Sequence, residues 1–432
     1  MKTVYGILVV PLSLGLALGV PAAARAAIVV QCPGDADGDA VIDAATHPTD
    51  PRYPAGPYSF PDNVRCMHLA AGDGFINMGD GRRLYMFGFS DATGQAEADV
   101  MDNGALAANF PAPTVLADEG DQLYLTLSNV GMVIRPDLFD PHSVHWHGFP
   151  NAADIFDGLP ESTISINMGA SLTYYYNVVE PGTYMYHCHV EAAEHMQMGM
   201  LGNLYVRPAQ NRLPNGTLLG SHTHSNPDNP TGTTPRDQDD PLDGDKYVYN
   251  DGDASTRYDV EYAIQIASMD PAFHDASETV QPLPFADMHD TYALLNGRGY
   301  PDTINPNELL NTADTPLPSQ KLHALVSATA GQRILLRISN LSITGFYTLA
   351  SSLPMRVVGR GARILRGGGE ATGPDLYYTT NSVTLGGGEA ADVIIDTAGV
   401  PAGTYFVYTT NLNYLSNDTE DRGGMMTEVV IN

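Results

Sequence analysis

The chain has few basic residues and, beyond its N-terminus, no long apolar run. Its 432 residues contain 21 Lys and Arg but 50 Asp and Glu, which gives a formal net charge of −29. Such an acidic chain repels phosphate backbones, so the balance argues against a nucleic-acid partner. After residue 26 no stretch approaches the roughly 18 apolar residues that a membrane-spanning helix requires. We therefore expect neither nucleic-acid binding nor a membrane span.

Helical periodicity is also scarce along the chain. Short runs rich in Val, Ile, Tyr and Thr are separated by Gly, Pro, Asn and Asp, as at residues 83–89, 122–128, 171–179 and 333–338. This spacing predicts an all-β sandwich fold. Hydrophobic residues make up 43% of the chain, enough to fill real cores, which excludes a disordered protein.

The N-terminus carries the pattern of an export signal. An apolar run at residues 5–20 follows Lys2, and Ala24-Arg25-Ala26 provides a small-residue cleavage site. This pattern predicts a signal peptide over residues 1–26. We expect an exported protein, periplasmic or extracellular, that begins near Ala27.

Three cysteines leave room for a single disulfide. Cys32 and Cys66 lie in the same N-terminal segment, and export permits disulfides, so these two are a candidate pair whose bonding stays open. Cys188 remains alone among residues that suggest another role for it.

An internal repeat indicates two domains of one fold. Residues 119–129, EGDQLYLTLSN, are echoed by residues 330–340, AGQRILLRISN, and PGTY at 181–184 is echoed by AGTY at 402–405. We predict an N-terminal extension over 27–79, a first domain over 80–207 and a second domain over 247–432. Residues 208–246, dense in Pro, Asn, Asp, Gly and Thr, are predicted to form the linker.

Histidines are concentrated in the first domain. Six of the 13 lie between residues 142 and 195, with Cys188 among them and Met200 shortly after. A cluster of this composition indicates metal binding. Side chains two apart share a face of an extended strand, so His187 and His189 face one way and Cys188 the other.

The same alternation sorts the ligands into two sites that lie back to back. His142, Cys188, His195 and Met200 form the first, a set of two imidazoles, a thiolate and a thioether that copper electron-transfer sites use and that zinc also accepts. The second site takes four imidazoles and could activate a small molecule such as dioxygen. Its members are His145, His147, His187 and His189.

The motifs HSVHWHG at 142–148, Asp157-Gly158 and EPGTYMYHCH at 180–189 resemble the multicopper oxidase family of laccase-like enzymes. The resemblance implies two cupredoxin-like Greek-key β-sandwich domains and copper as the cofactor. It assigns His142, Cys188 and His195 to type 1 copper, with Met200 as axial ligand. It assigns His145 to type 2 copper, His147, His187 and His189 to the type 3 pair, and proton delivery to Asp157. The reductant would be a phenol, a metal ion or a redox protein, and dioxygen would be reduced to water.

The chain departs from the family pattern in both domains. His195 follows Cys188 by seven residues, two more than is common in the family, which indicates an insertion that carries Glu191 and Glu194. We interpret these two carboxylates as surface groups, and Met196 and Met198 compete with Met200 for the axial role. In the second domain Tyr408-Thr409-Thr410 replaces the His-Cys-His motif, so we expect no type 1 site there.

The catalytic centre is the open question. The first domain supplies half of the histidines that a full trinuclear centre needs, and members of the family with such an arrangement close the centre between subunits as trimers. We therefore expect a homotrimer. Histidines outside the cluster could complete it, namely His222, His224, His274, His289 and His323. A blue-copper electron carrier with a vestigial second site and a copper nitrite reductase remain the alternative functions.

Overall fold

The computed structural model describes residues 28–42, 63–227, 229–230, 244–311, 316–369, 373–420 and 422–432. The predicted export signal and His47 lie outside these residues. The described part contains many strands and three short α-helices, which confirms the all-β prediction. None of its helices has the length and apolar character needed to cross a bilayer.

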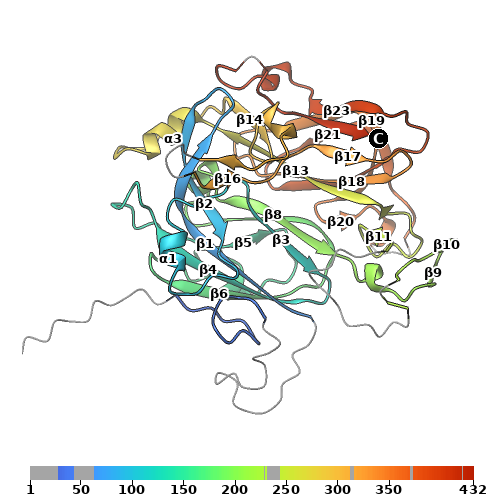
Figure 1. Ribbon diagram of the computed structural model, residues 1–432, viewed down its shortest axis with the longest axis horizontal. Coiled ribbons are helices and arrows are strands. Elements are labelled where there is room, and N and C mark those ends of the chain that lie inside the picture. The colour runs from blue at the N-terminus through green and yellow to red at the C-terminus, as the bar shows by residue number, and fades with distance from the viewer. Residues whose placement is uncertain are drawn as a thin grey trace, which may run out of the picture.

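The first domain consists of two four-stranded sheets (Figure 1). One has the order β2-β1-β4-β6, with β1 (Val64–Asn77) antiparallel to β2 (Arg83–Asp91) and parallel to β4 (Gln122–Gly131), and with β6 (Ser171–Asn177) at the edge. The other has the order β3-β8-β7-β5, from β3 (Ala112–Asp118) and β8 (Leu201–Arg207) to β7 (Gly182–His187) and β5 (His145–His147). Alternating apolar residues such as Leu123, Leu125 and Leu127 fill the core between these sheets.

Strand β1 falls inside the segment predicted to be an N-terminal extension, so the first sandwich begins before residue 80. The strand is hard to detect because it contains Gly72, Asp73 and Gly74, residue types that are depleted in strands. The buried Asp73 carboxylate accepts hydrogen bonds from the Tyr85 hydroxyl at 2.9 Å and from the Val133 amide at 3.0 Å, which offsets the cost of burying it. The other domain boundaries stay predictions.

A disulfide joins Cys32 to Cys66, so the candidate pair is bonded. It ties residues 28–42 to the start of β1. The same segment runs beside β6, where the Val29 amide donates to Ser171 Oγ at 2.9 Å. The N-terminal segment is thus part of the first domain.

The second domain is built on one extended set of paired strands, shown above the first domain in Figure 1. Its order is β14 (Tyr292–Leu295), β13 (Val260–Met269), β18 (Arg333–Asn340), β22 (Glu389–Asp396), β19 (Tyr347–Arg360), β23 (Gly403–Thr409), β24 (Met426–Ile431) and β17 (Val326–Ala328). β20 (Arg363–Ile364) and β21 (Tyr378–Leu385) also pair with β19. β19 pairs with β23 near Leu349 and with β22 from Arg356 onward, so one long strand connects two parts of the sandwich.

Shorter elements complete the described chain. The α-helices are α1 (Val100–Asn103), α2 (Ala192–Gln197) and α3 (Pro271–Ser277). The two-stranded pairs are β9 (Leu218–Leu219) with β10 (His222–Thr223), β11 (Lys246–Tyr247) with β12 (Arg257–Tyr258), and β15 (Leu309–Leu310) with β16 (Pro318–Gln320). The 3₁₀ helices are Asp154–Phe156, Ala209–Arg212, Phe285–Asp287, Asp302–Ile304, Gly367–Gly369 and Leu412–Leu415.

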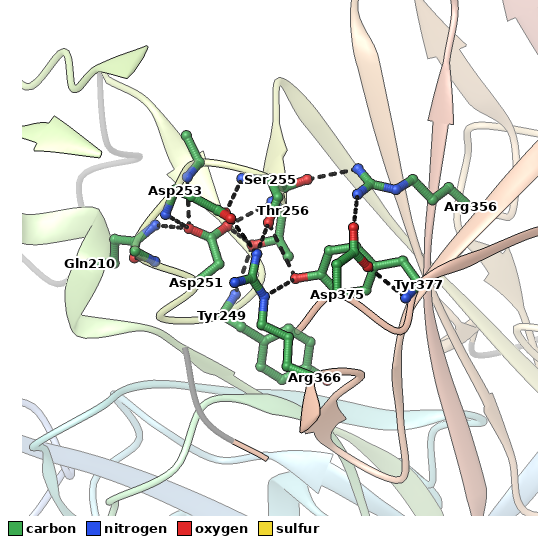
Figure 2. A network of polar contacts seen from close by, with 12 residues as sticks. Gln210, Tyr249, Asp251, Asp253, Ser255, Thr256, Arg356, Arg366, Asp375 and Tyr377 are labelled. Atoms are coloured by element: carbon green, nitrogen blue, oxygen red, sulfur yellow. Dashed lines mark hydrogen bonds and ion pairs between the residues drawn. The ribbon is translucent and has the colours of Figure 1, made fainter. Parts of the chain in front are cut away.

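Part of the predicted linker is fastened to the second domain by a polar network (Figure 2). The Asp251 carboxylate accepts hydrogen bonds from Gln210 Nε2 at 2.8 Å and from the Thr256 amide at 2.6 Å. Beside it, the Arg366 guanidinium forms an ion pair with Asp253 at 2.5 Å. These contacts hold Gln210, and with it the described start of the linker, against the second domain.

The two domains share an apolar interface. Its buried cluster contains Met86, Phe110, Met185 and Leu201 from the first domain and Ala267, Met269, Tyr292, Leu294, Leu341 and Ala390 from the second, with others. Helix α3 lies against β2, and its Phe273 side chain belongs to the core of the first domain (Figure 1). The sandwiches are therefore packed against each other rather than loosely connected.

A buried ion pair also crosses this interface. Arg337 on β18 is fully buried, and its guanidinium lies 2.8 Å from Glu261 Oε2 and 3.6 Å from Asp392 Oδ1. Thr183 on β7, five residues before Cys188, donates to the same Asp392 oxygen at 2.5 Å and accepts from Arg337 at 3.1 Å. The strand that carries the cysteine is thus linked to the second domain.

Arg337→Met is expected to lower the free energy of unfolding by about 3 kcal/mol, because it leaves a buried Asp392 carboxylate without its cation. Denaturant titration followed by fluorescence measures the loss. The control is Arg360→Met, which removes a more exposed arginine and should change stability by less than about 0.5 kcal/mol. Equal stability of the two variants would show that the buried pair contributes nothing.

Candidate metal centres

The thiol site lies inside the first domain, next to β7. Cys188 Sγ is 3.2 Å from His195 Nδ1 and 3.9 Å from His142 Nδ1, and all three side chains are fully buried. His142 is held by a two-way backbone bridge to Ile166. Met200, also fully buried, accepts from the Cys188 amide at 3.1 Å and donates to the His195 carbonyl at 2.8 Å. Backbone bonds thus connect the cysteine, the second histidine and the methionine.

The protonation of this site favours a bound cation. Burial raises the pKa of the Cys188 thiol to about 12, so the thiolate needs a positive partner. Burial lowers the pKa of His195 to about 4 and that of His142 well below its usual value, so both imidazoles are neutral and have lone pairs to give. Two nitrogens and a thiol that converge in this way fit copper and equally fit zinc.

The imidazole site lies on the other side of the same short segment. His145, His147 and His187 each present a ring nitrogen within 4.8 Å of the others. The His189 ring lies 5.0 Å from the His145 ring and 5.5 Å from the His187 ring, centroid to centroid. Register places His145 of β5 directly opposite His187 of β7. The structure therefore brings all four histidines together.

Hydrogen bonds to carbonyls orient two of these rings. His145 Nδ1 donates to the Asp157 carbonyl at 2.6 Å, and His187 Nδ1 donates to the Cys188 carbonyl at 2.9 Å. With Nδ1 occupied, Nε2 of each ring is the free lone pair, as is usual for metal-binding histidines. Burial lowers the pKa of His187 to about 3 and lowers those of His145 and His147 as well, so these rings are neutral.

The four histidines line a cavity of about 510 Å³ at the domain interface. The opposite wall comes from the second domain, through residues 341–346 and Gly387–Gly388. Gly388 has φ of +84°, and a Cβ at this position would lie 2.6 Å from His147 Nε2. Backbone of the second domain thus touches the imidazole site. Over the described part of the chain, this wall contributes no histidine.

The remaining described histidines lie elsewhere, in contacts of their own. His222 pairs with Asp245 at 2.7 Å, and His224 bonds to the Tyr247 hydroxyl at 3.0 Å. His274 of α3 lies 2.6 Å from the Tyr85 carbonyl and 3.1 Å from the Gln197 carbonyl. His289 is exposed and His323 is half-buried. Neither metal-ligand group in the first domain includes any of these residues.

Asp157 lies on a turn beside the imidazole site. Its carbonyl receives the hydrogen bond of His145, and its carboxylate oxygen Oδ1 is 3.5 Å from His145 Nδ1. Gly158 has φ of +79°, and a Cβ there would lie 2.2 Å from the Val144 carbonyl, so the turn requires glycine. Ser143 Oγ donates to the Gly158 carbonyl at 2.7 Å, which fixes the turn near the cluster.

The pattern of known proteins agrees with this geometry. Residues 94–229 match the family model described as multicopper oxidase. Multicopper oxidase MmcO of Mycobacterium tuberculosis is 39% identical over 81 residues, which cover 19% of this chain and 14% of that protein. Laccase-3 of Thanatephorus cucumeris is 21% identical over 332 residues, which cover 75% of this chain and 46% of that protein. The chain therefore matches less than half of the length of either relative.

Solved structures resemble the whole described fold. Blue copper oxidase of Nitrosomonas europaea superposes with a TM-score of 0.57 at 18% identity, over 85% of this chain and 86% of that one. Copper nitrite reductase of the same organism gives 0.51 at 16% identity, over 85% and 94%. These likenesses support the predicted cupredoxin-like fold. Together with the sequence match in the first domain, they show that the chain belongs to the multicopper oxidase family.

Proposed function

We propose that the chain is a copper-dependent oxidase. Type 1 copper bound by His142, Cys188, His195 and Met200 accepts single electrons from a reductant. Copper at the imidazole site receives these electrons and supplies the redox chemistry that reduces dioxygen to water. That site consists of His145, His147, His187 and His189.

One observation carries this proposal: the tripeptide His187-Cys188-His189 takes part in both sites. Cys188 lies in the thiol group, while both flanking imidazoles lie in the other group. An electron that arrives at the thiol therefore has a route of a few covalent bonds to the second site. The carbonyl of Cys188, which holds His187, adds a hydrogen bond to this route.

Copper content together with the optical spectrum tests the function. An oxidase should hold one copper at the thiol site and more than one at the imidazole site, with both visible and near-ultraviolet absorption. A single blue copper per chain would mean an electron carrier. One copper at each site would mean a nitrite reductase, which the fold also accommodates, although the His-Cys-His and His-Trp-His motifs favour the oxidase.

Export and assembly belong to the same proposal. The Cys32–Cys66 disulfide supports a periplasmic or extracellular location, since such bonds persist in oxidising compartments. A homotrimer would let another subunit add ligands to the cavity, whose wall from the second domain carries no histidine in the described residues. The mass of the copper-loaded protein in solution tests this assembly.

Asp157 is proposed to relay protons to dioxygen at the imidazole site. Its carboxylate lies beside His145 and is a quarter exposed, so it can exchange protons with water. Asp157→Asn keeps the turn and the shape but cannot carry a proton. Oxygen consumption should fall at least about tenfold, equal to roughly 1.4 kcal/mol in the barrier, while reduction of type 1 copper stays normal.

The matched control is Asp154→Asn, the same change at an exposed position three residues earlier. It should leave oxygen consumption unchanged. If Asp157→Asn also turned over normally across the pH range, Asp157 would be a turn residue only.

A further inference from the structure

Carboxylates gather at the outer edge of the thiol site. Asp140 and Glu191 each place an oxygen within 4.8 Å of a His195 ring nitrogen and of each other. Glu194, in the first turn of α2, acts on the same group electrostatically, because Asp140 and Glu191 both raise its pKa. Glu191 and Glu194 belong to the loop that is longer than the family pattern. Their interpretation as mere surface groups therefore needs revision.

His195 connects these carboxylates to the thiol. Its Nδ1 faces Cys188 Sγ at 3.2 Å, so Nε2 lies on the edge of the ring that points away from the sulfur. Nε2 is fully buried and has no hydrogen-bond partner among the described residues. A buried nitrogen of this kind normally has a partner. It is an unfilled ligand position next to two carboxylates.

The charges around this edge are out of balance. Burial and the neighbouring Glu191 raise the pKa of Asp140 to about 6, and burial with Asp140 raises that of Glu194 to about 7. The nearby cation is Arg135, which binds Asp137 at 2.8 Å and the carbonyls of Ser277 and Thr279. Across the described ranges no ion pair involves Asp140, Glu191 or Glu194. A bound cation would remove this repulsion.

We propose that Asp140, Glu191 and His195 Nε2 bind a divalent metal ion, Mn²⁺ or Fe²⁺, as the electron donor of the enzyme. The inference rests on the proposed function and names its reductant. Each ion loses one electron and leaves as the trivalent ion, and the imidazole of His195 conducts that electron toward the thiol site. Four such electrons, with four protons, reduce one dioxygen to two waters, so the reaction balances.

The geometry favours a metal ion over the other two classes of reductant. The His195 ring is fully buried, so a phenol ring cannot reach its edge, whereas an ion held by Asp140 and Glu191 lies beside it. Carboxylate oxygens with one imidazole are suitable ligands for Mn²⁺ and Fe²⁺. The exposed Phe139 next to Asp140 is where a redox protein would dock instead, and the experiment separates that case.

Binding of Mn²⁺ to the full, copper-loaded chain tests the site directly, through loss of the spin-resonance signal of the free ion. Wild type should retain one tightly bound Mn²⁺, and both Asp140→Asn and Glu191→Gln should weaken its binding at least about tenfold. Glu308→Gln makes the same change at an exposed glutamate of the second domain and should bind as wild type does. Unchanged blue absorption in each variant verifies that the thiol site is intact.

The outcomes separate this inference from the proposed function. Equal Mn²⁺ binding by all variants, or none by wild type, would overturn the cation site even if a phenol were oxidised normally. Loss of oxidation of a basic redox protein in Glu191→Gln, without loss of Mn²⁺ binding, would overturn it in favour of protein docking. Tight Mn²⁺ binding that depends on Asp140 and Glu191 would support the site, and absence of oxygen uptake with every reductant would then count against the oxidase alone.

Discussion

Cys188→Ser is expected to abolish the intense visible absorption of the copper-loaded protein and to lower substrate oxidation at least about a thousandfold. The absorption arises from charge transfer between thiolate and copper, and Cys188 is the one free cysteine of the chain. Serine nearly matches the volume of cysteine, so the surrounding core, with Met200 and His142, should stay packed. A serine hydroxyl buried at this position stays protonated and is a poor ligand for copper.

Absorption spectroscopy, copper analysis and circular dichroism on one preparation measure this result. The imidazole site should keep its copper in Cys188→Ser, because its four ligands lie on the opposite side of the segment. A variant that remained blue would refute the assignment of type 1 copper to Cys188.

His147→Ala is expected to produce the opposite separation. Oxygen consumption should fall at least about a thousandfold, while the protein stays blue and is still bleached by a reductant without oxygen. The reason is that His147 faces the interdomain cavity, against Gly388, and takes no part in the thiol group. The ring is only half-buried, so its removal should not endanger the fold.

Stopped-flow reduction followed by oxygen-electrode measurements distinguishes the two steps. His289→Ala, which removes an exposed histidine of the second domain, is the control and should behave as wild type. If His147→Ala consumed oxygen at the normal rate, the imidazole cluster would not be the place of oxygen reduction.

The separation of the two sites could be predicted from the sequence because strand alternation is a local property. His187, Cys188 and His189 are consecutive, so their opposite directions follow from the extended backbone at the end of β7. The all-β fold was predictable for the same reason, since short Val-, Ile- and Tyr-rich runs need no distant information. The Cys32–Cys66 pair was recognisable because few partners were available.

Features that depend on distant parts of the chain could not be predicted in this way. Asp140 and Glu191 meet at His195 only after the loop before His142 packs beside α2. Residues 341–346 and Gly388 have no metal-binding signature, yet they form one wall of the cavity. Strand β1 was hidden because the contacts of Asp73, rather than its own propensity, stabilise it.

The buried link between Thr183 and Asp392 bears on how this protein could be dissected. A fragment that ended after the first sandwich would lose the acceptor of Thr183 on the copper-bearing strand. It would also lose Phe273, whose side chain fills part of the first core. The two halves are therefore not interchangeable modules, and a minimal blue protein cut from this chain must keep α3 and β22 or replace what they bury.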